Sequence, residues 1–293
     1  MMTLQRIGIG LAGIVATLTI APAARAQVLY ADVGKNIQYE QTAGNTVVPF
    51  NGGTNAFFFT RSFFANLGDY NAGTTTFSGV FSPRTFNIFG LLDCCGHPGA
   101  GFQSIYLLPS DMDSRFPTGI PYTMNLTGPA GNATATVSYL ADIYTNDIPK
   151  LSAASFNALQ TASPVAPLTI NFNAFTPNPG ASLGQGFFDI FDLTAGGVPW
   201  NAAGFSSSTT SLTIPAGTFT VGHDYVFQLI FDDLARDPNA TVANDYRSDV
   251  RTVGYFTVSA AVPEPATWAM MIGGMFMAGG ALRRRRRLEA LRC

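Results

Sequence analysis

Between residues 27 and 261 the chain alternates short apolar and polar positions, separated by clusters of turn-forming residues. The alternation is cleanest at 168–173, where Leu168, Ile170 and Phe172 share one face and polar residues take the other. A period of two residues is typical of β-strands. The pattern predicts strands at 85–92, 101–108, 121–127, 133–144, 167–175, 186–193 and 252–258, one strand from 211 that ends before Pro215, and a long strand from the turn at 222–224 to 231.

One segment departs from this period. Residues 153–161 place Phe156 and Leu159 on one helical face, and Ser152 stands where an N-cap residue is preferred. We expect one short helix there, packed as a crossover. Short strands at this spacing favour an all-β fold, an antiparallel β-sandwich of jelly-roll or immunoglobulin-like type.

The N-terminus carries the features of a secretory signal peptide. Arg6 precedes an apolar run at 7–20, and Ala24 and Ala26 form a small-residue cleavage pattern that would leave Gln27 first. An uncleaved N-terminal anchor is the alternative. We expect three parts: a signal peptide at 1–26, an exported β-sandwich domain at 27–261 and a C-terminal segment at 262–293.

The C-terminal segment joins three physically different stretches. Pro263-Glu264-Pro265 cannot continue a helix or a strand ladder, because neither proline has an N–H group. Residues 266–282 carry no charge, and a helix of this length reaches roughly 25 Å, enough to cross a thin bilayer, with Trp268 at its outer edge. A basic block follows and should remain in the cytoplasm: Arg283, Arg284, Arg285, Arg286 and Arg287.

This order of Pro-Glu-Pro motif, apolar helix and arginine cluster closely resembles the PEP-CTERM sorting signal of Gram-negative bacteria, in the variant with Trp-Ala-Met-Met at 268–271. The resemblance covers about thirty of the 293 residues. It implies processing near the motif by an exosortase, a transpeptidase-like membrane enzyme. It also implies transient anchoring in the inner membrane, followed by a place at the cell surface or in an exopolysaccharide matrix.

Two features of the C-terminal segment bear on this resemblance. The chain departs from the family pattern in continuing beyond the arginines, from Leu288 to Cys293. An ordinary single-pass membrane anchor is the alternative interpretation. Four glycines make the helix a poor permanent anchor and a plausible face for close packing against a partner enzyme: Gly273, Gly274, Gly279 and Gly280.

The charge of the exported part differs from that of the whole chain. Eight basic and sixteen acidic residues lie between 27 and 261, a net charge near −8, whereas the whole chain carries −2. An acidic body argues against nucleic acid and anionic membrane surfaces as partners. Its poverty in Glu and Lys, with abundant Gly, Thr, Asn, Phe and Ser, is typical of strands and turns.

Cys94 and Cys95 are the cysteines of the exported part. In an oxidising compartment they could form a vicinal disulfide, pair with another chain or stay free. A metal site would need more ligands than the nearby His97 adds, and a Cys–His nucleophile pair would need an orienting residue and a pocket. We expect a structural disulfide or loop.

Aspartates gather in three segments expected to be loops, at 111–113, 142–147 and 232–249. Calcium takes loop carboxylates, which makes Asp232, Asp233 and Asp237 the candidate ligands. None of the three segments has a known calcium-loop spacing, so we expect solvated turn acids and no cofactor. His223, in the turn at 222–224, is likewise expected to be solvated, because the adjacent Asp224 is badly placed to orient it.

The aromatic cluster Phe57-Phe58-Phe59 and Phe63-Phe64 has two interpretations. It is either an exposed platform for stacking on sugars or, as we expect, core with alternate rings facing two layers.

Together these features predict a non-enzymatic exported protein, a structural or adhesive component of exopolysaccharide or biofilm. One alternative is a carbohydrate-binding module, which exposed aromatics in a shallow groove would favour. Another is a secreted polysaccharide or ester hydrolase, which two facing aspartates in a cleft or a Ser-His-Asp arrangement around His223 would favour. A purely structural subunit predicts a featureless surface.

Overall fold

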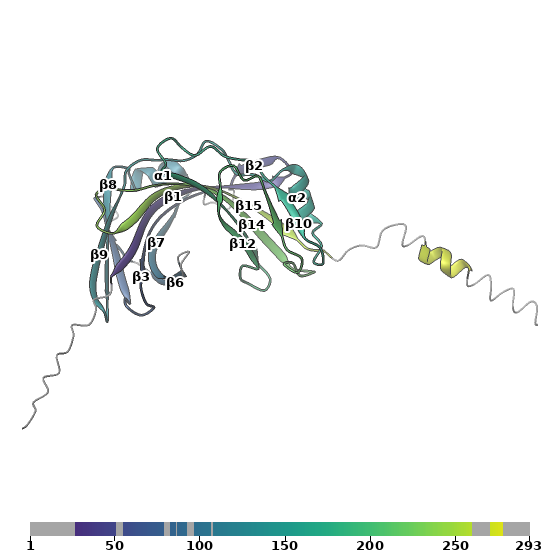
Figure 1. The fold of residues 1–293 in the computed structure, drawn as a ribbon, viewed down its shortest axis with the longest axis horizontal. Helices are drawn as coiled ribbons and strands as arrows, with labels where there is room; N and C mark the ends of the chain where they lie inside the picture. Colours follow the sequence, from purple (N-terminus) through teal and green to yellow (C-terminus); the bar gives the residue numbers. More distant parts are fainter. Residues whose placement is uncertain are drawn as a thin grey trace, which may run out of the picture.

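The computed structural model describes residues 27–50, 55–78, 83–85, 87–92, 97–106, 108–259 and 270–277. Its main layer is a nine-stranded sheet bent into an arch (Figure 1). The strands of this sheet are β1 (Val28–Ala43), β2 (Thr46–Pro49), β3 (Ala56–Phe64), β6 (Asn87–Leu92), β7 (Pro98–Tyr106), β11 (Leu183–Asp192), β12 (Trp200–Ser206), β14 (Asp224–Ala235) and β15 (Ala243–Thr257). They follow the order β12-β11-β14-β15-β1-β3-β7-β6, with β2 paired to β1.

A parallel pair joins the two halves of this sheet. Residues 30–40 of β1 lie beside residues 243–253 of β15, so strands near the start and the end of the domain meet at its centre. The other described pairs of the sheet are antiparallel. The prediction of an antiparallel sandwich was therefore wrong at this pair. Local pattern cannot reveal it, because parallel strands need a long connection and here most of the domain lies between them.

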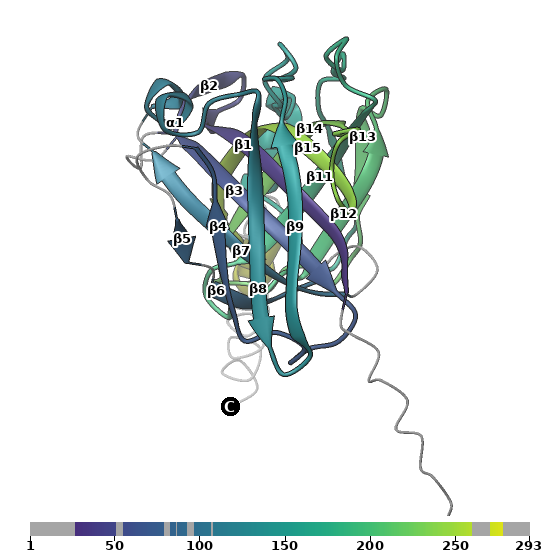
Figure 2. The same cartoon turned by 90° about the vertical axis from the view of Figure 1, so that its left-hand side faces the viewer.

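Two separate layers cover the convex face of the arch (Figures 1 and 2). One is a second sheet of order β5-β4-β8-β9 with the helix α1; the other is the strand pair β10-β13 with the helix α2. Their bounds are β4 (Ala72–Thr76), β5 (Arg84–Thr85), α1 (Pro109–Arg115), β8 (Ile120–Gly128), β9 (Gly131–Tyr139), α2 (Ala153–Gln160), β10 (Leu168–Asn171) and β13 (Ser211–Ile214). The β-sandwich prediction is confirmed at this coarse level.

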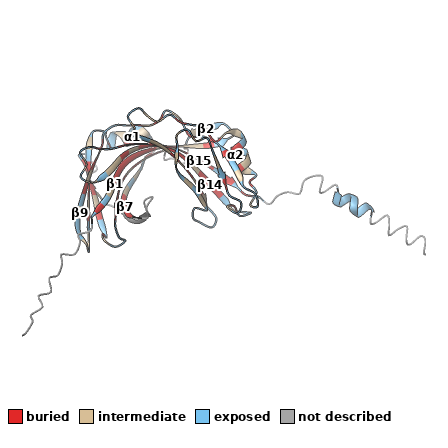
Figure 3. Cartoon of the chain, in the orientation of Figure 1, coloured by how far each residue is buried: buried red, intermediate tan, exposed pale blue. Residues whose placement is uncertain are grey.

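Strand alternation divides the main sheet between a core face and a concave face. In β14, Tyr225, Phe227, Leu229 and Phe231 are buried against the layer of α2 and β10, while alternate residues face the hollow of the arch. In β3, Phe58 is fully buried and stacks on Phe116 with 3.8 Å between the ring centroids. Figure 3 shows buried residues running along the whole arch.

The phenylalanine cluster follows the same alternation. Phe58 and Phe64 belong to the core, whereas Phe57 and Phe59 are half-buried on the concave face. Alternate rings therefore face two sides, as we expected, but one side is open rather than a second core layer.

Helix α2 matches its prediction closely. Ser152 is its N-cap and accepts a hydrogen bond from the Ser155 amide, and Phe156 and Leu159 are buried. A second helix was not expected: Asp111 and Asp113 lie on α1, which starts at Pro109 without a side-chain cap. The prediction of a loop at 111–113 and of a single helix was wrong, because the usual N-cap signal is missing.

The strand predictions hold for most segments and miss five strands. Predicted strands correspond to β5 through β11 and β13 through β15, although β9 ends at Tyr139 rather than 144, β10 ends at Asn171 rather than 175, and β15 starts at Ala243 rather than 252. The sequence pattern did not predict β1, β2, β3, β4 or β12 as strands, and β3 was noted only as an aromatic cluster. Glycines and polar residues interrupt their apolar alternation, and pairing within the sheets, which the pattern does not show, is what makes them strands.

Several predictions concern residues outside the described ranges. They are the signal peptide with Ala24 and Ala26, the pair Cys94 and Cys95, the motif residues Pro263, Glu264 and Pro265, Trp268, and the block Arg283–Arg287. Of the predicted membrane helix at 266–282, the structure describes 270–277, which is helical and exposed. Within the described ranges, no helix is both long and apolar enough to cross a membrane.

Replacing Ser152 by Ala should lower the free energy of unfolding by about 1 kcal/mol, because the first turn of α2 loses its side-chain acceptor. Urea unfolding followed by circular dichroism measures the change. Thr210→Ala, at an exposed position outside the helix, is the control and should leave stability within about 0.5 kcal/mol. Equal losses in both variants would contradict the capping role.

Candidate functional site

The concave face of the main sheet holds two adjoining cavities, which we call together the concave groove. The first has a volume of about 330 Å³ and the second about 180 Å³. Both are lined by Arg61, Asp249 and Arg251. The first adds Asn36, Phe57, Phe59, Gly101, Phe102 and Gln103, and the second adds Phe187, Asp189, Ile230, Asp232 and Arg247.

Strand register brings these residues together from distant parts of the chain. Asn36 of β1 lies between Asp249 of β15 and Phe57 of β3, and Asp249 is also directly opposite Asp232 of β14. Residues that face each other across neighbouring strands project from the same side of a sheet. The parallel pairing of β1 with β15 therefore assembles the floor of the groove.

Ion pairs fix part of this floor. Arg61 donates two hydrogen bonds to Asp32, with 2.9 Å between Nε and Oδ1. Arg247 Nη2 lies 3.2 Å from Asp232 Oδ2, and Gln185 Nε2 donates to the same oxygen over 3.3 Å. Asp32 and Asp232 are each 1% exposed, so both carboxylates are shielded from solvent and position the two arginines.

Other polar groups of the floor have no hydrogen-bond partner among the described residues. They are Asn36 Nδ2 and Oδ1, Asp249 Oδ1, Asp232 Oδ1, and the Nε atoms of Arg247 and Arg251. Buried polar groups in folded proteins are nearly always hydrogen-bonded, and those that are not call for an explanation. Their concentration in one groove is typical of a binding site.

Burial and a facing carboxyl group favour the protonated form of Asp232. Burial raises the pKa of Asp232 well above its ordinary value; the positive charge of Arg247 opposes the shift, and the neighbouring Asp249 adds to it. Asp249 is directly opposite Asp232 on the neighbouring strand. Like charges on facing carboxyl groups disfavour each other, so Asp232 keeps its proton at pH values where an isolated aspartate has lost it.

Burial also acts on the arginines. It lowers the pKa of Arg251, an effect that Asp249 and Asp189 oppose. Burial alone would lower the pKa of Arg247 too, but the charges of Asp232 and Asp32 raise it above the ordinary value. Arg247 is thus held as a cation by its partners, whereas Arg251 has no ion-pair partner among the described residues.

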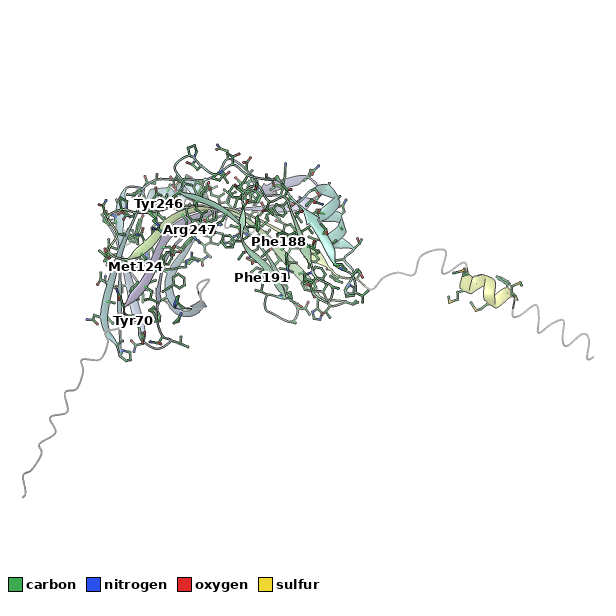
Figure 4. The ribbon with its side chains drawn as sticks, in the orientation of Figure 1. Tyr70, Met124, Phe188, Phe191, Tyr246 and Arg247 are labelled. Carbon is green, nitrogen blue, oxygen red and sulfur yellow. The ribbon has the colours of Figure 1, made fainter. Side chains whose placement is uncertain are left out.

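Aromatic rings flank the charged floor on both sides. Phe57 and Phe59 of β3 and Phe187 and Phe191 of β11 are half-buried on this face. Figure 4 shows Phe191 and Arg247 on the inner side of the arch. The guanidinium carbon of Arg61 lies 4.5 Å from the Phe59 ring centroid, a cation–π contact that fixes both side chains.

Gly34 makes this arrangement possible. A Cβ atom at this position would lie 2.4 Å from the Phe59 ring and 2.6 Å from Arg247 Cγ. Any larger residue would displace one or both side chains from the groove. Because Gly34 has no side chain, Phe59 and Arg247 can both pack over it and keep their positions in the groove.

The prediction of solvated turn acids at 232–249 was wrong: Asp232 and Asp233 lie on β14, Asp249 lies on β15, and these three and Asp237 are buried. The candidate calcium ligands are also not brought together. Asp232 faces the groove, whereas Asp233 lies on the other face and accepts a hydrogen bond of 2.9 Å from the Asn178 amide. Asp237 accepts from the amides of Ser138 and Asn239. Adjacent strand residues point to opposite faces. Within the part of the chain that the structure describes, no group of three or more His, Cys, Asp or Glu is placed to hold a metal ion.

His223 is not the solvated residue that we expected. Its Nδ1 lies 2.8 Å from Asp192 Oδ2, and Asp192 also accepts from the Thr194 and Ala195 amides. Burial opposes the charge of Asp192, but the hydrogen bonds from Ala195 and His223 lower its pKa overall. The orienting carboxylate comes from β11, 31 residues away, rather than from Asp224. Among the described residues, no serine or cysteine hydrogen-bonds to His223.

The sequence pattern did not point to four polar residues of the groove, Asn36, Arg61, Arg247 and Arg251, and Asp249 was noted only as one of the aspartates at 232–249. A signal was present in Phe57-x-Phe59-x-Arg61 and in Arg247-x-Asp249-x-Arg251. Each run places three residues on one face of a strand, and each includes charged residues where a strand face packed in a core would have apolar ones.

Comparisons with known proteins add little. No protein-family model and no curated protein matches the chain. Solved structures similar to it include the FN1–FN3 domains of chicken CNTN1, at 9% identity and TM-score 0.24, over 79% of this chain and 68% of that chain. Another is the BSP domain of a biofilm associated protein, at 11% identity and TM-score 0.20, over 78% of this chain and 30% of that chain. With TM-scores this low, neither likeness bears on function.

Replacing Asp233 by Asn should flatten the pH dependence of stability between about pH 4 and pH 6. Burial raises the pKa of Asp233 to about 6; the Asn178 amide opposes the shift, and Asp249 adds to it. In that window the folded state binds more protons than the unfolded state, so stability falls as pH rises, by up to about 3 kcal/mol for this group.

Urea unfolding of both proteins at pH 4, 5, 6 and 7 measures this change. The exposed Asp111→Asn variant is the control and should keep the wild-type slope. An unchanged slope in Asp233→Asn would contradict the assignment.

Proposed function

We propose that this protein is an exported component of the cell surface or extracellular matrix that binds polysaccharide in its concave groove. The observation that carries the proposal is the groove itself: half-exposed aromatic rings flank a floor in which several buried polar atoms have no hydrogen-bond partner among the described residues. Sugars present apolar C–H faces and hydroxyl edges, and this pairing of surfaces suits both.

The groove supports a binding role over a purely structural one. A structural or adhesive subunit without a ligand predicts a featureless surface, whereas the concave face places aromatic and charged side chains side by side. Unpartnered buried groups lower stability, and a bound ligand that supplies their hydrogen bonds is a physical reason to keep them. An adhesive role in a polysaccharide matrix is compatible with such binding.

A hydrolase is the second candidate, because Asp232 and Asp249 face each other in the groove. Glycoside hydrolysis uses carboxyl groups about 5 Å apart or more. Both carboxyl groups must also reach the scissile bond, whereas Asp232 is 1% exposed and its Oδ2 is engaged by Arg247 and Gln185. An ester hydrolase would use the His223–Asp192 pair, which no described serine or cysteine completes. These observations favour binding without catalysis.

Delivery to the surface rests on the sequence signals. In this proposal the signal peptide directs export of the domain at 27–261. The segment at 262–293, which resembles a PEP-CTERM signal, holds the chain in the inner membrane of a Gram-negative bacterium until an exosortase processes it near Pro263-Glu264-Pro265.

Replacing Phe57 or Phe187 by Ala should weaken polysaccharide binding about fivefold each, since each loses a stacking contact of roughly 1 kcal/mol. Affinity electrophoresis of the full-length protein measures the effect. The gels contain dextran, mannan, alginate or the exopolysaccharide of the bacterium that makes the protein. Leu67→Ala, at a 75% exposed position, is the control. Failure of every polysaccharide to retard the wild-type protein would refute the proposed function.

Replacing Glu264 by Ala should block C-terminal processing. The mature wild-type protein is expected to lack the mass of residues 262–293, whereas the variant, or wild type in cells without the exosortase, should keep the tail and remain in the inner membrane. Intact-mass spectrometry of fractionated cells measures both. A tail retained in wild-type cells would contradict the sorting proposal and leave an ordinary membrane anchor.

A further inference from the structure

The larger cavity of the groove has the size and chemistry of a subsite for one small polar unit. Its volume of about 330 Å³ lies at the lower end of the range of roughly 300–1,000 Å³ that is typical of ligand pockets. Asn36, Asp249 and Arg251 line it, and all three carry buried polar atoms without a partner among the described residues. Asn36 is 2% exposed, and both ends of its amide are unsatisfied.

These three side chains offer donors and acceptors next to each other. The Asn36 amide donates and accepts, the Asp249 carboxylate accepts, and the Arg251 guanidinium donates. A hydroxyl group also both donates and accepts, so neighbouring hydroxyls can satisfy all three. An anionic ligand would be repelled by Asp249, and a cationic ligand would be repelled by Arg251. A neutral ligand therefore fits the combination of Asp249 and Arg251 better than a charged one.

The wall of the cavity supplies the complementary apolar surface. Phe57 stands beside Asn36 on the neighbouring strand, and Phe59 packs against Arg61 and over Gly34, which has no side chain to displace it. The positive charge of Arg61 is already matched by Asp32, which leaves Arg251 as the donor of this cavity without an ion-pair partner among the described residues. A pyranose ring has this same division between an apolar face and a hydroxyl edge.

We propose that this cavity binds one neutral hexopyranose unit, with its hydroxyls hydrogen-bonded to Asn36, Asp249 and Arg251 and its C–H face against Phe57 and Phe59. The assignment rests on the proposed function and narrows it, because it names the sugar class and the residues that select it. The second cavity, beside Phe187, then accommodates the adjoining part of the polysaccharide.

Saturation-transfer NMR and calorimetry on the full-length protein, in a detergent without a sugar headgroup, test the assignment. The ligands are methyl α-D-glucopyranoside, methyl α-D-mannopyranoside, methyl β-D-galactopyranoside and sodium D-glucuronate. We expect at least one neutral glycoside to bind, and its affinity to fall at least tenfold in Asn36→Leu and in Asp249→Asn. Gln228→Leu, on the same face but outside the lining of either cavity, should bind as wild type.

Stability separates a binding role from a structural one. A leucine side chain in place of the Asn36 amide would fill the site without leaving polar atoms unsatisfied, so Asn36→Leu should keep or raise the melting temperature while binding is lost. A lower melting temperature together with unchanged glycoside affinity would overturn the assignment and make Asn36 a structural residue.

The remaining outcomes distinguish this proposal from the broader one. Binding of glucuronate alone, lost in Arg251→Met, would overturn the neutral-sugar assignment and leave polysaccharide binding intact. Polysaccharide binding that depends on Phe57 and Phe187 but is unchanged in Asn36→Leu would also overturn the subsite alone. Absence of binding to any polysaccharide would remove the proposed function and the subsite together.

Discussion

Eleven consecutive residue pairs join β1 to β15 in parallel, and the architecture depends on this ladder. It links the sheet half made of β3, β6 and β7 to the half made of β11, β12 and β14, so that each outer layer covers its own core while both halves share one concave face. The same ladder sets Asn36 beside Asp249 and Gly34 beside Arg247. A slip of one residue would turn these side chains to the opposite face, so the fold and the groove have a common origin.

The groove combines side chains that are fixed by ion pairs with buried polar atoms that have no hydrogen-bond partner among the described residues. Arg61 and Arg247 are held by Asp32 and Asp232, and these buried pairs position aromatic and aliphatic neighbours rather than add much net stability. Asn36, Asp249 and Arg251 are the opposite case, since their unpartnered atoms lower stability as long as nothing is bound. Such a site is stabilised by its own ligand, which couples occupancy of the groove to the stability of the domain.

On the convex side of the main sheet, two separate hydrophobic cores meet at the central strands, and polar residues lie between them. Polar residues fill the seam: the fully buried Lys35 reaches Asp113 over 2.6 Å and Asp142 over 3.1 Å, and Gln41 exchanges hydrogen bonds with the backbone of Leu151. These contacts tie α1, the segment after β9 and the segment before α2 to β1. The strand that carries Asn36 on its concave face is thus fixed from behind by charged and amide groups on its other face.

The sequence alone predicted the features that depend only on residues close together in the chain. The period of two from Leu168 and along β14 predicted strands, and Ser152 with Phe156 and Leu159 predicted α2, because strand period and helix capping act over a few residues. The export signal at the N-terminus and the sorting signal at the C-terminus were likewise inferred from local sequence, and both remain predictions. Tertiary structure alone decided the parallel pairing of β1 with β15, the partner of His223 and the gathering of Asn36, Arg61, Asp249 and Arg251 in one groove. Residues some two hundred positions apart meet there, and strand register, rather than local pattern, decides which of them face each other.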